Sequence, residues 1–142
     1  MRFFSFLFLF AGALLFTSCE VTVNDFPNED TQDELVGTWD ATSFERNESG
    51  DAPQEEIGRI LDAFRLDFNR GGPTTGTVTF TLVPLARLGQ DDQVTSGSYE
   101  VRNNGEVLGI GSDELNMELS GNTLTLDGQV GTQFWTIVAS KR

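Results

Sequence analysis

Apolar and polar residues alternate with a period of two along most of the chain after Leu35. The alternation is clearest in the stretches FRLDFN (64–69), TVTFTL (77–82), ELNMEL (114–119) and TLTLD (123–127). Strict alternation is typical of half-buried antiparallel strands, in which one set of side chains faces the core and the other faces water. The pattern therefore predicts an all-β domain.

Four further stretches complete the predicted strand set. They are LVGTWDATSF (35–44), SYEVR (98–102), EVLGI (106–110) and a strand within TQFWTIVAS (132–140). Glycine-rich and asparagine-rich turn signals, among them NNG and SGN, separate the strands. Short antiparallel strands in such a series favour a closed barrel, because closure removes exposed strand edges. We therefore expect an eight-stranded antiparallel barrel.

One segment after the first strand has a different period. In DAPQEEIGRILDAF (51–64), apolar residues recur at i, i+3, i+4 and i+7 from Ile57 to Phe64. This spacing is typical of one face of a helix, and Asp51 is a suitable N-cap. The sequence predicts a short helix over residues 53–62.

The N-terminus has the composition of a secretory signal peptide. One positive charge, Arg2, precedes an apolar run of 14 residues from Phe3 to Phe16. The run is shorter than the roughly 20 residues that a membrane-spanning helix needs. We therefore expect residues 1–18 to be a cleaved signal.

The segment that follows the signal is acidic. Residues 20–34 carry six acids and no base, with only scattered apolar residues. Such a composition buries too little apolar surface to order itself. We expect a flexible tether over residues 19–34 and a single folded domain over residues 35–142.

Charge and composition exclude several classes of function. The formal net charge is −13, and a surface so acidic repels nucleic-acid phosphates. There is no histidine, and Lys141 is the only lysine, so histidine-based catalytic and zinc sites and a P-loop are excluded. We expect neither an enzyme nor a metal or cofactor site.

The junction at the end of the predicted signal resembles a known processing site. Cys19 is the only cysteine and follows Thr17 and Ser18. The stretch resembles the lipobox of bacterial lipoproteins, and the resemblance implies that Cys19 is acylated and anchors the mature chain to a membrane. It also implies a location in the cell envelope, at the outer membrane on either its periplasmic or its outer face. Ordinary signal-peptidase cleavage is the alternative.

A second resemblance concerns the barrel. The stretch LVGTW (35–39) looks like the Gly-x-Trp opening strand of the lipocalin family, and Gly37 and Trp39 match that motif. The whole domain is similar to the small lipocalin-like domains of lipoproteins from the Bacteroidota. The resemblance implies a lipocalin-like barrel in which the tryptophan closes one end beneath a basic residue from the last strand. Lys141 and Arg142 are the candidates.

Two classes of function remain open. A carrier would hold a small, partly apolar ligand in the barrel mouth. An interaction module, such as an inhibitor or an accessory subunit of an envelope complex, would have a filled barrel and no ligand. The candidate lining residues are the inward large side chains Phe64, Phe68, Phe80, Tyr99, Met117 and Trp135. Core packing is the alternative role for all six, because the interior of an eight-stranded barrel is just wide enough for side chains or one small ligand.

Two details refine the carrier hypothesis. A buried phenol needs a hydrogen-bond partner, which a ligand could supply to Tyr99. Arg65 and Arg102 fall on the outward side of the alternation, so the pattern predicts no inward arginine. A ligand would therefore be neutral or weakly polar.

The segment 83–97 is long for a hairpin loop and is a second candidate contact surface.

Overall fold

Nine strands and one α-helix make up most of the part of the chain that the structure describes. The computed structural model describes residues 27–48 and 52–142, so the predicted signal and Cys19 lie outside the described residues. The elements are helix α1 (Pro27–Leu35), strands β1 (Gly37–Glu48), β2 (Gln54–Glu55), β3 (Leu61–Arg70), β4 (Thr75–Pro84), β5 (Gln93–Arg102), β6 (Val107–Ile110), β7 (Asp113–Ser120), β8 (Thr123–Val130) and β9 (Gln133–Lys141), and the 3-10 turns η1 (Ala86–Leu88) and η2 (Asn103–Gly105).

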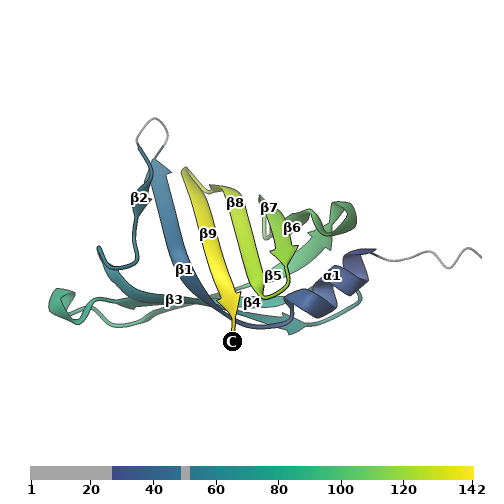
Figure 1. Ribbon diagram of the computed structural model, residues 1–142, viewed down its shortest axis with the longest axis horizontal. Helices are drawn as coiled ribbons and strands as arrows, with labels where there is room; N and C mark the ends of the chain where they lie inside the picture. Colours follow the sequence, from purple (N-terminus) through teal and green to yellow (C-terminus); the bar gives the residue numbers. More distant parts are fainter. Residues whose placement is uncertain (1–26, 49–51) are drawn as a thin grey trace, which may run out of the picture.

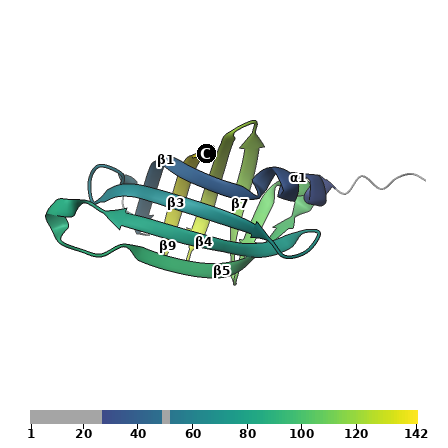
Figure 2. The ribbon, with the colours of Figure 1, turned by 90° about the horizontal axis from the view of Figure 1, so that it is seen from below.

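The long strands form a closed antiparallel barrel (Figures 1 and 2). Strands β3 to β9 pair in chain order, and β1 pairs with both β3 and β9 to close the ring. The start of β1 (37–40) lies against β3, whereas the stretch from Trp39 to Glu48 lies against β9. The two-residue strand β2 is added beside the far end of β1. The predicted eight-stranded barrel is confirmed, with β2 as an additional short strand.

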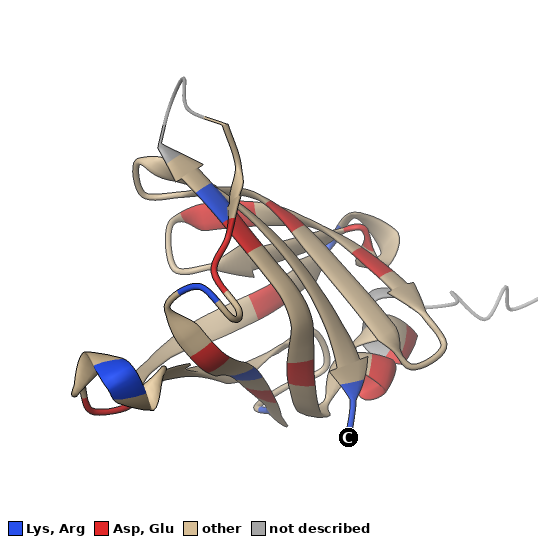
Figure 3. Cartoon of the chain, turned by 60° about the vertical axis from the view of Figure 1, so that its left-hand side comes forward, with Lys and Arg blue, Asp and Glu red and all other residues tan. Residues whose placement is uncertain are grey.

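The alternation in the sequence corresponds to the two faces of the barrel wall. On β3, Phe64, Leu66 and Phe68 are buried, whereas the residues between them are at least partly exposed. The apolar positions of β7 and β8 are buried in the same way at Leu115, Met117, Leu124 and Leu126. Acidic residues are spread over the strands and over α1 (Figure 3). The core thus consists of the inward set that the period of two predicts.

The helix predicted over residues 53–62 is not present. The segment contains β2, an isolated bridge between Ile57 and Leu61, and a turn over residues 58–60. Gly58 has a φ of +82°, which a helix does not accommodate, and the carbonyl of Glu56 accepts three successive amides from residues 59–61. The apolar spacing that suggested a helix arises because a tight turn leads directly into the inward face of β3.

Hydrogen bonds to one carboxylate hold β2 against β1. Glu55 accepts from the Ser43 hydroxyl and from the backbone amides of Phe44 and Ile57. Burial opposes ionisation of Glu55, but these hydrogen bonds together outweigh it and lower the pKa of the carboxyl. Local side-chain bonding therefore competes successfully with helix formation in this segment.

Part of the predicted flexible tether is folded. Residues 27–35 form α1, which lies at one end of the barrel (Figure 2). Gln32 and Leu35 on this helix are fully buried, and the Lys141 ammonium donates to the Glu34 carbonyl at 2.6 Å. The helix is ordered by docking, because Leu35 and Gln32 are buried at the end of the core. Residues 27–34 of the predicted tether are thus helical and packed against the barrel. Within the described ranges, no helix is long and apolar enough to cross a membrane.

The connection between β4 and β5 is shorter than the sequence indicated. Residues 83 and 84 belong to β4, and residues 93–97 belong to β5. The remaining connection, residues 85–92, contains η1 and is exposed over residues 86–92. Residues 95–97 are threonine, serine and glycine, a composition typical of loops. They lie in a part of β5 that is exposed on both faces, so the sequence there does not alternate between apolar and polar residues.

Candidate functional site: a cavity at the open end of the barrel

The two ends of the barrel differ in how they are filled. One end is closed by α1 and by Trp39, whose indole Nε1 donates to the Leu35 carbonyl at 2.7 Å. The other end lies where β4 ends and where β5 and β9 begin. There the inward side chains do not meet, and they leave a cavity of about 240 Å³.

The cavity is mostly apolar. Its lining comes from six strands and comprises Phe80, Leu82, Thr95, Ile110, Asp113, Leu115, Val130 and Trp135. Asp113 is the one charged residue in this lining, and its carboxylate lies 3.5 Å from the amide of Gly131. An apolar hollow with few polar groups is typical of a site for a small, partly apolar molecule.

The cavity exists because the wall separates beside β5. Strand β6 pairs only with Tyr99–Arg102 of β5, so residues 93–97 have no partner in β6. These residues pair with β4 on their other side, and Val94 is 63% exposed. Thr95 and Ile110 therefore border an opening instead of packing against each other.

A continuous series of aromatic rings supports the cavity wall. Trp135 contacts Phe44 with ring centroids 5.1 Å apart, and Phe44 contacts Phe64 at 4.7 Å. Phe64 in turn lies 6.0 Å from Phe80. The two aromatic residues in the cavity lining are thus joined through two fully buried rings. Packed aromatic side chains are held in fixed orientations, so the cavity is preformed on this side.

The structure separates the six residues that the sequence suggested as a ligand site. Phe80 and Trp135 line the cavity. Phe64 is buried behind them, and Met117 is buried in the core. The other two, Phe68 and Tyr99, form an edge-to-face pair 5.3 Å apart that is also buried.

Tyr99 finds its partner within the chain. Its hydroxyl accepts a hydrogen bond of 3.2 Å from Nε2 of Gln32, which also donates to the Thr75 carbonyl at 2.6 Å. Burial raises the pKa of the Tyr99 phenol, although the Gln32 bond and the charge of Arg70 act in the opposite direction. The interaction predicted for a ligand is thus made by α1.

Several lining residues were missed at the sequence level. Leu82 and Leu115 lie on the same inward faces as Phe80 and Met117, so the alternation does identify them as inward residues. Aromatic side chains alone were selected as candidates, and this excluded the aliphatic half of the lining. The positions of Thr95 and Asp113 depend on the separation of β5 from β6, for which the sequence contains no local signal.

A second, polar hollow of about 360 Å³ lies beside the apolar cavity. Arg46, Glu56, Gln90 and Gln93 contribute its polar side chains, and Leu82 lines both hollows. The Glu56 side chain is only 2% exposed; Arg46 Nε lies 3.2 Å and Arg59 Nη2 lies 2.6 Å from its Oε1. Oε2 of Glu56 is buried and accepts no hydrogen bond from the described residues.

The presence of Arg46 in this hollow corrects a sequence-based expectation. Arg65 and Arg102 do face outward, where they pair with Asp40 and with Glu100 and Glu114. Arg46, however, follows Phe44 by two residues and is paired in register with Trp135, so it is on the inward face of β1. The bulge between Ala41 and Ser43 shifts the alternation of this strand, which concealed the inward arginine in the sequence.

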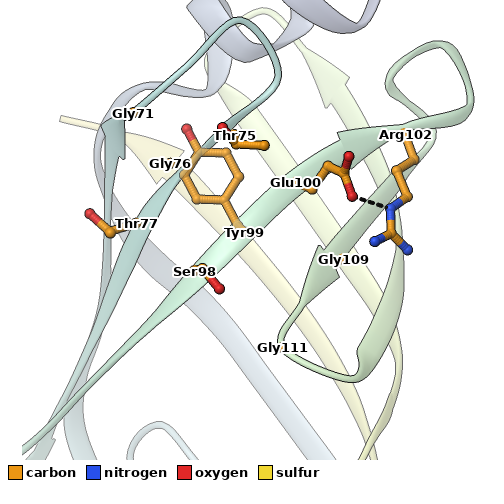
Figure 4. A pocket seen from close by; sticks show the side chains of 10 residues that line it. All are labelled: Gly71, Thr75, Gly76, Thr77, Ser98, Tyr99, Glu100, Arg102, Gly109 and Gly111. Carbon is orange, nitrogen blue, oxygen red and sulfur yellow. Dashed lines mark hydrogen bonds and ion pairs between the residues drawn. The ribbon is translucent and has the colours of Figure 1, made fainter.

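A third hollow lies on the outer surface of the barrel, over the start of β4 and the ends of β5 and β6 (Figure 4). It has a volume of about 470 Å³ and is lined largely by small residues, including Gly71, Gly76 and Gly109. The Arg102 guanidinium at its edge is bound by Glu100 and Glu114. The hollow is open to solvent, and the one cation in its lining is already paired. We therefore regard the apolar cavity as the better candidate site.

Comparisons with known proteins bear on the fold. No protein-family model and no curated protein sequence matches the chain. Among solved structures, the barrel is similar to a de novo designed fluorescence-activating β-barrel, with a TM-score of 0.50 and 14% identity over 80% of this chain and 98% of the designed one. It is also similar to a redesigned β-barrel, with a TM-score of 0.52 and 12% identity over 79% of this chain and 95% of that one.

A third similar structure contains a bound small molecule. It is the redesigned barrel mFAP1 bound to DFHBI, with a TM-score of 0.50 and 11% identity over 78% of this chain and 98% of that chain. At such low identity the likeness shows the fold alone. The chain therefore has the architecture of a small closed antiparallel barrel.

Proposed function

We propose that this protein is a lipid-anchored protein of the cell envelope whose barrel binds a small, partly apolar molecule. The observation that carries the proposal is the preformed apolar cavity between Phe80 and Trp135. The alternative function is an interaction module with a filled barrel. It does not explain why one end of the barrel is hollow while the other is tightly packed. The barrel bound to DFHBI supports the proposal only by showing that this architecture accommodates a ligand.

The dimensions of the cavity limit the ligand and its affinity. A volume of about 240 Å³ is slightly below the usual range for sites that hold drug-sized molecules, so the ligand is smaller than these. Burial of apolar groups contributes about 0.8 kcal/mol per CH₂, or about 6 kcal/mol for eight carbons, before the cost of association. We therefore expect dissociation constants on the order of micromolar to millimolar.

The position of α1 is compatible with an anchor at Cys19. Seven residues lie between Cys19 and Pro27, and the eight Cα–Cα steps from one to the other span at most about 29 Å when the chain is extended. Because α1 lies at the closed end, an acylated Cys19 would hold that end nearest the membrane. The mouth would then face away from the lipid surface and remain accessible. Two or more acyl chains would be needed for stable attachment.

Binding is tested with the mature polypeptide, residues 19–142 carrying Cys19→Ser, and the neutral ligand 1-octanol in isothermal titration calorimetry. We expect saturable binding and a change in tryptophan emission, because Trp135 lines the cavity. Val130→Phe should fill the cavity and weaken binding at least tenfold. Phe134→Ala is the matched control, because Phe134 faces outward beside Trp135 and is 48% exposed. If Val130→Phe binds 1-octanol as tightly as the protein without this substitution, the ligand lies elsewhere. If no saturable binding is observed, the carrier function fails and the interaction module remains.

Anchoring has an independent test. Intact mass spectrometry of the full chain, expressed in a bacterium that processes lipoproteins and extracted with detergent, should show a polypeptide that starts at an acylated Cys19. Cys19→Ala should remove the added mass and the association with membranes. An unmodified chain that starts at Cys19 or Glu20 would refute lipidation while leaving the ligand proposal intact.

A further inference from the structure

We infer that the ligand of the cavity is an amphipathic acid, whose apolar body lies between Phe80 and Trp135 and whose acidic head is bound by Arg46. The inference rests on the proposed function and specifies the chemical class of the ligand. It replaces the neutral ligand that the sequence predicted, because the structure places an arginine at the mouth.

Arg46 stands directly beside the apolar cavity. It lines the polar hollow together with Phe44 and Leu82, and Leu82 also lines the apolar cavity. Phe44 contacts Trp135 with ring centroids 5.1 Å apart, and Arg46 is the register partner of Trp135. A molecule that fills the apolar cavity and extends past Leu82 therefore reaches the side chain of Arg46.

The guanidinium of Arg46 is oriented and only partly used. Its Nε lies 3.2 Å from the Glu56 carboxylate, whereas its terminal amino groups bond to no residue within 27–48 and 52–142. The side chain is 34% exposed, and it lines both this hollow and a smaller polar one beside Gln133. An arginine fork held at one nitrogen is suited to bind a carboxylate with its remaining donors.

The local charge favours an anion over a cation. Glu56 faces two arginines, Arg46 and Arg59, so the three side chains together carry a formal charge of +1. Gln90 and Gln93 line the same hollow, and their amide groups can donate to the oxygens of an acidic head. Asp113 is the opposing charge, but it lines the apolar cavity and is not part of the polar hollow.

The net charge of the chain sets a further limit. With a formal charge of −13, the protein repels anions at a distance, and the repulsion grows with the charge of the ligand. A single carboxylate is therefore a better match than a phosphate or a dicarboxylate. The two arginines that face Glu56 offset this repulsion locally.

The test compares three ligands with eight carbons that differ only in the head group: octanoate, 1-octanol and octylammonium. Each is titrated calorimetrically into residues 19–142 carrying Cys19→Ser at pH 7. We expect octanoate to bind at least tenfold more tightly than octanol, and octylammonium to bind most weakly. Arg46→Gln should reduce the affinity for octanoate to that for octanol and leave octanol unchanged. Arg65→Gln, an outward arginine on β3, is the matched control and should change neither.

The outcomes separate the inference from the proposed function. If octanol binds as tightly as octanoate, the role of Arg46 is refuted and the apolar cavity remains the site. If octylammonium binds most tightly and Asp113→Asn weakens it, the ligand is a cation and the inference is overturned. If none of the three binds, the carrier function itself fails. If circular dichroism shows that Arg46→Gln does not fold, Arg46→Lys is used in its place. Because this variant keeps the positive charge, it should retain a reduced preference for octanoate over octanol.

Discussion

The Lys141 ammonium lies 5.3 Å from the centroid of the Trp39 ring, so the end of the last strand covers the start of the first. The same ammonium donates to the Glu34 carbonyl at 2.6 Å, which ties α1 into this junction. The resemblance noted in the sequence implied a basic residue above the tryptophan and named Lys141 or Arg142. The structure shows Lys141 in that place, whereas Arg142 pairs with Asp40.

Replacing Trp39 by alanine should strongly destabilise the fold. The ring is fully buried and its Nε1 donates to the Leu35 carbonyl. Loss of a buried tryptophan costs about 3–5 kcal/mol, because the surrounding core cannot collapse into the space. Chemical denaturation measures this loss, and a change below about 1 kcal/mol would show that Trp39 is peripheral.

Lys141→Met should destabilise the protein moderately. The substitution keeps much of the aliphatic stem but removes the cation over Trp39, an interaction of roughly 0.5–1 kcal/mol at a partly exposed site. It also removes the hydrogen bond to Glu34. Arg142→Met serves as the control, because its ion pair with Asp40 is on the surface and contributes little. Equal effects of the two substitutions in thermal unfolding would contradict a special role for Lys141.

Titration of the single tyrosine should report the closed end of the barrel. Burial raises the pKa of Tyr99, so its phenol should stay protonated beyond the usual range near 10. Because the folded pKa is the higher one, stability is fully present below the unfolded pKa and falls as the pH rises through the folded pKa. Absorbance near 295 nm reads Tyr99 alone, and a normal titration curve in the folded protein would mean that α1 does not cover it.

Acid should weaken the attachment of β2 through Glu55. Hydrogen bonds lower the pKa of this carboxyl below 4.5, so its contribution is present above the unfolded pKa and is lost as the pH falls through the folded pKa. Glu55→Gln should destabilise the protein at pH 7 and flatten the dependence of stability on pH in the acid range. Glu118→Gln, at an exposed position on β7, is the comparison and should leave the slope unchanged.

Two glycines on neighbouring strands should respond differently to alanine. A Cβ at Gly76 would lie 2.0 Å from the Asn69 carbonyl and 2.7 Å from the Tyr99 ring, whereas at Gly97 the nearest atom is 3.7 Å away. Overpacking of this kind typically costs about 1–3 kcal/mol, and the contact with backbone places Gly76→Ala at or above the upper end. Gly97→Ala should stay within about 0.5 kcal/mol of the wild type. Similar stabilities of the two variants in urea would contradict the packing at Gly76.

Two of the differences between the expected and the observed secondary structure had a common cause. Residues 53–62 have helical spacing but form β2 and a turn, because Glu55 bonds to the Ser43 hydroxyl on β1 and to the backbone amide of Phe44. Residues 27–34 have the composition of a tether but form most of α1, because Leu35 and Gln32 enter the end of the core. In each case a contact with a distant part of the barrel outweighed the local pattern.

The sequence by itself determined which side chains face the core along the regular strands. A strand half exposed to water must alternate, so the inward positions of β3, β4, β7 and β8 follow from the order of apolar and polar residues alone. The same rule placed Arg65 and Arg102 outside. Tertiary structure alone decided where the barrel is hollow, that α1 and not a ligand is the partner of Tyr99, and that Arg46 stands beside Trp135. These features depend on a bulge in β1, on the separation of β5 from β6 and on the docking of a helix, each of which arises from contacts between residues far apart in the chain.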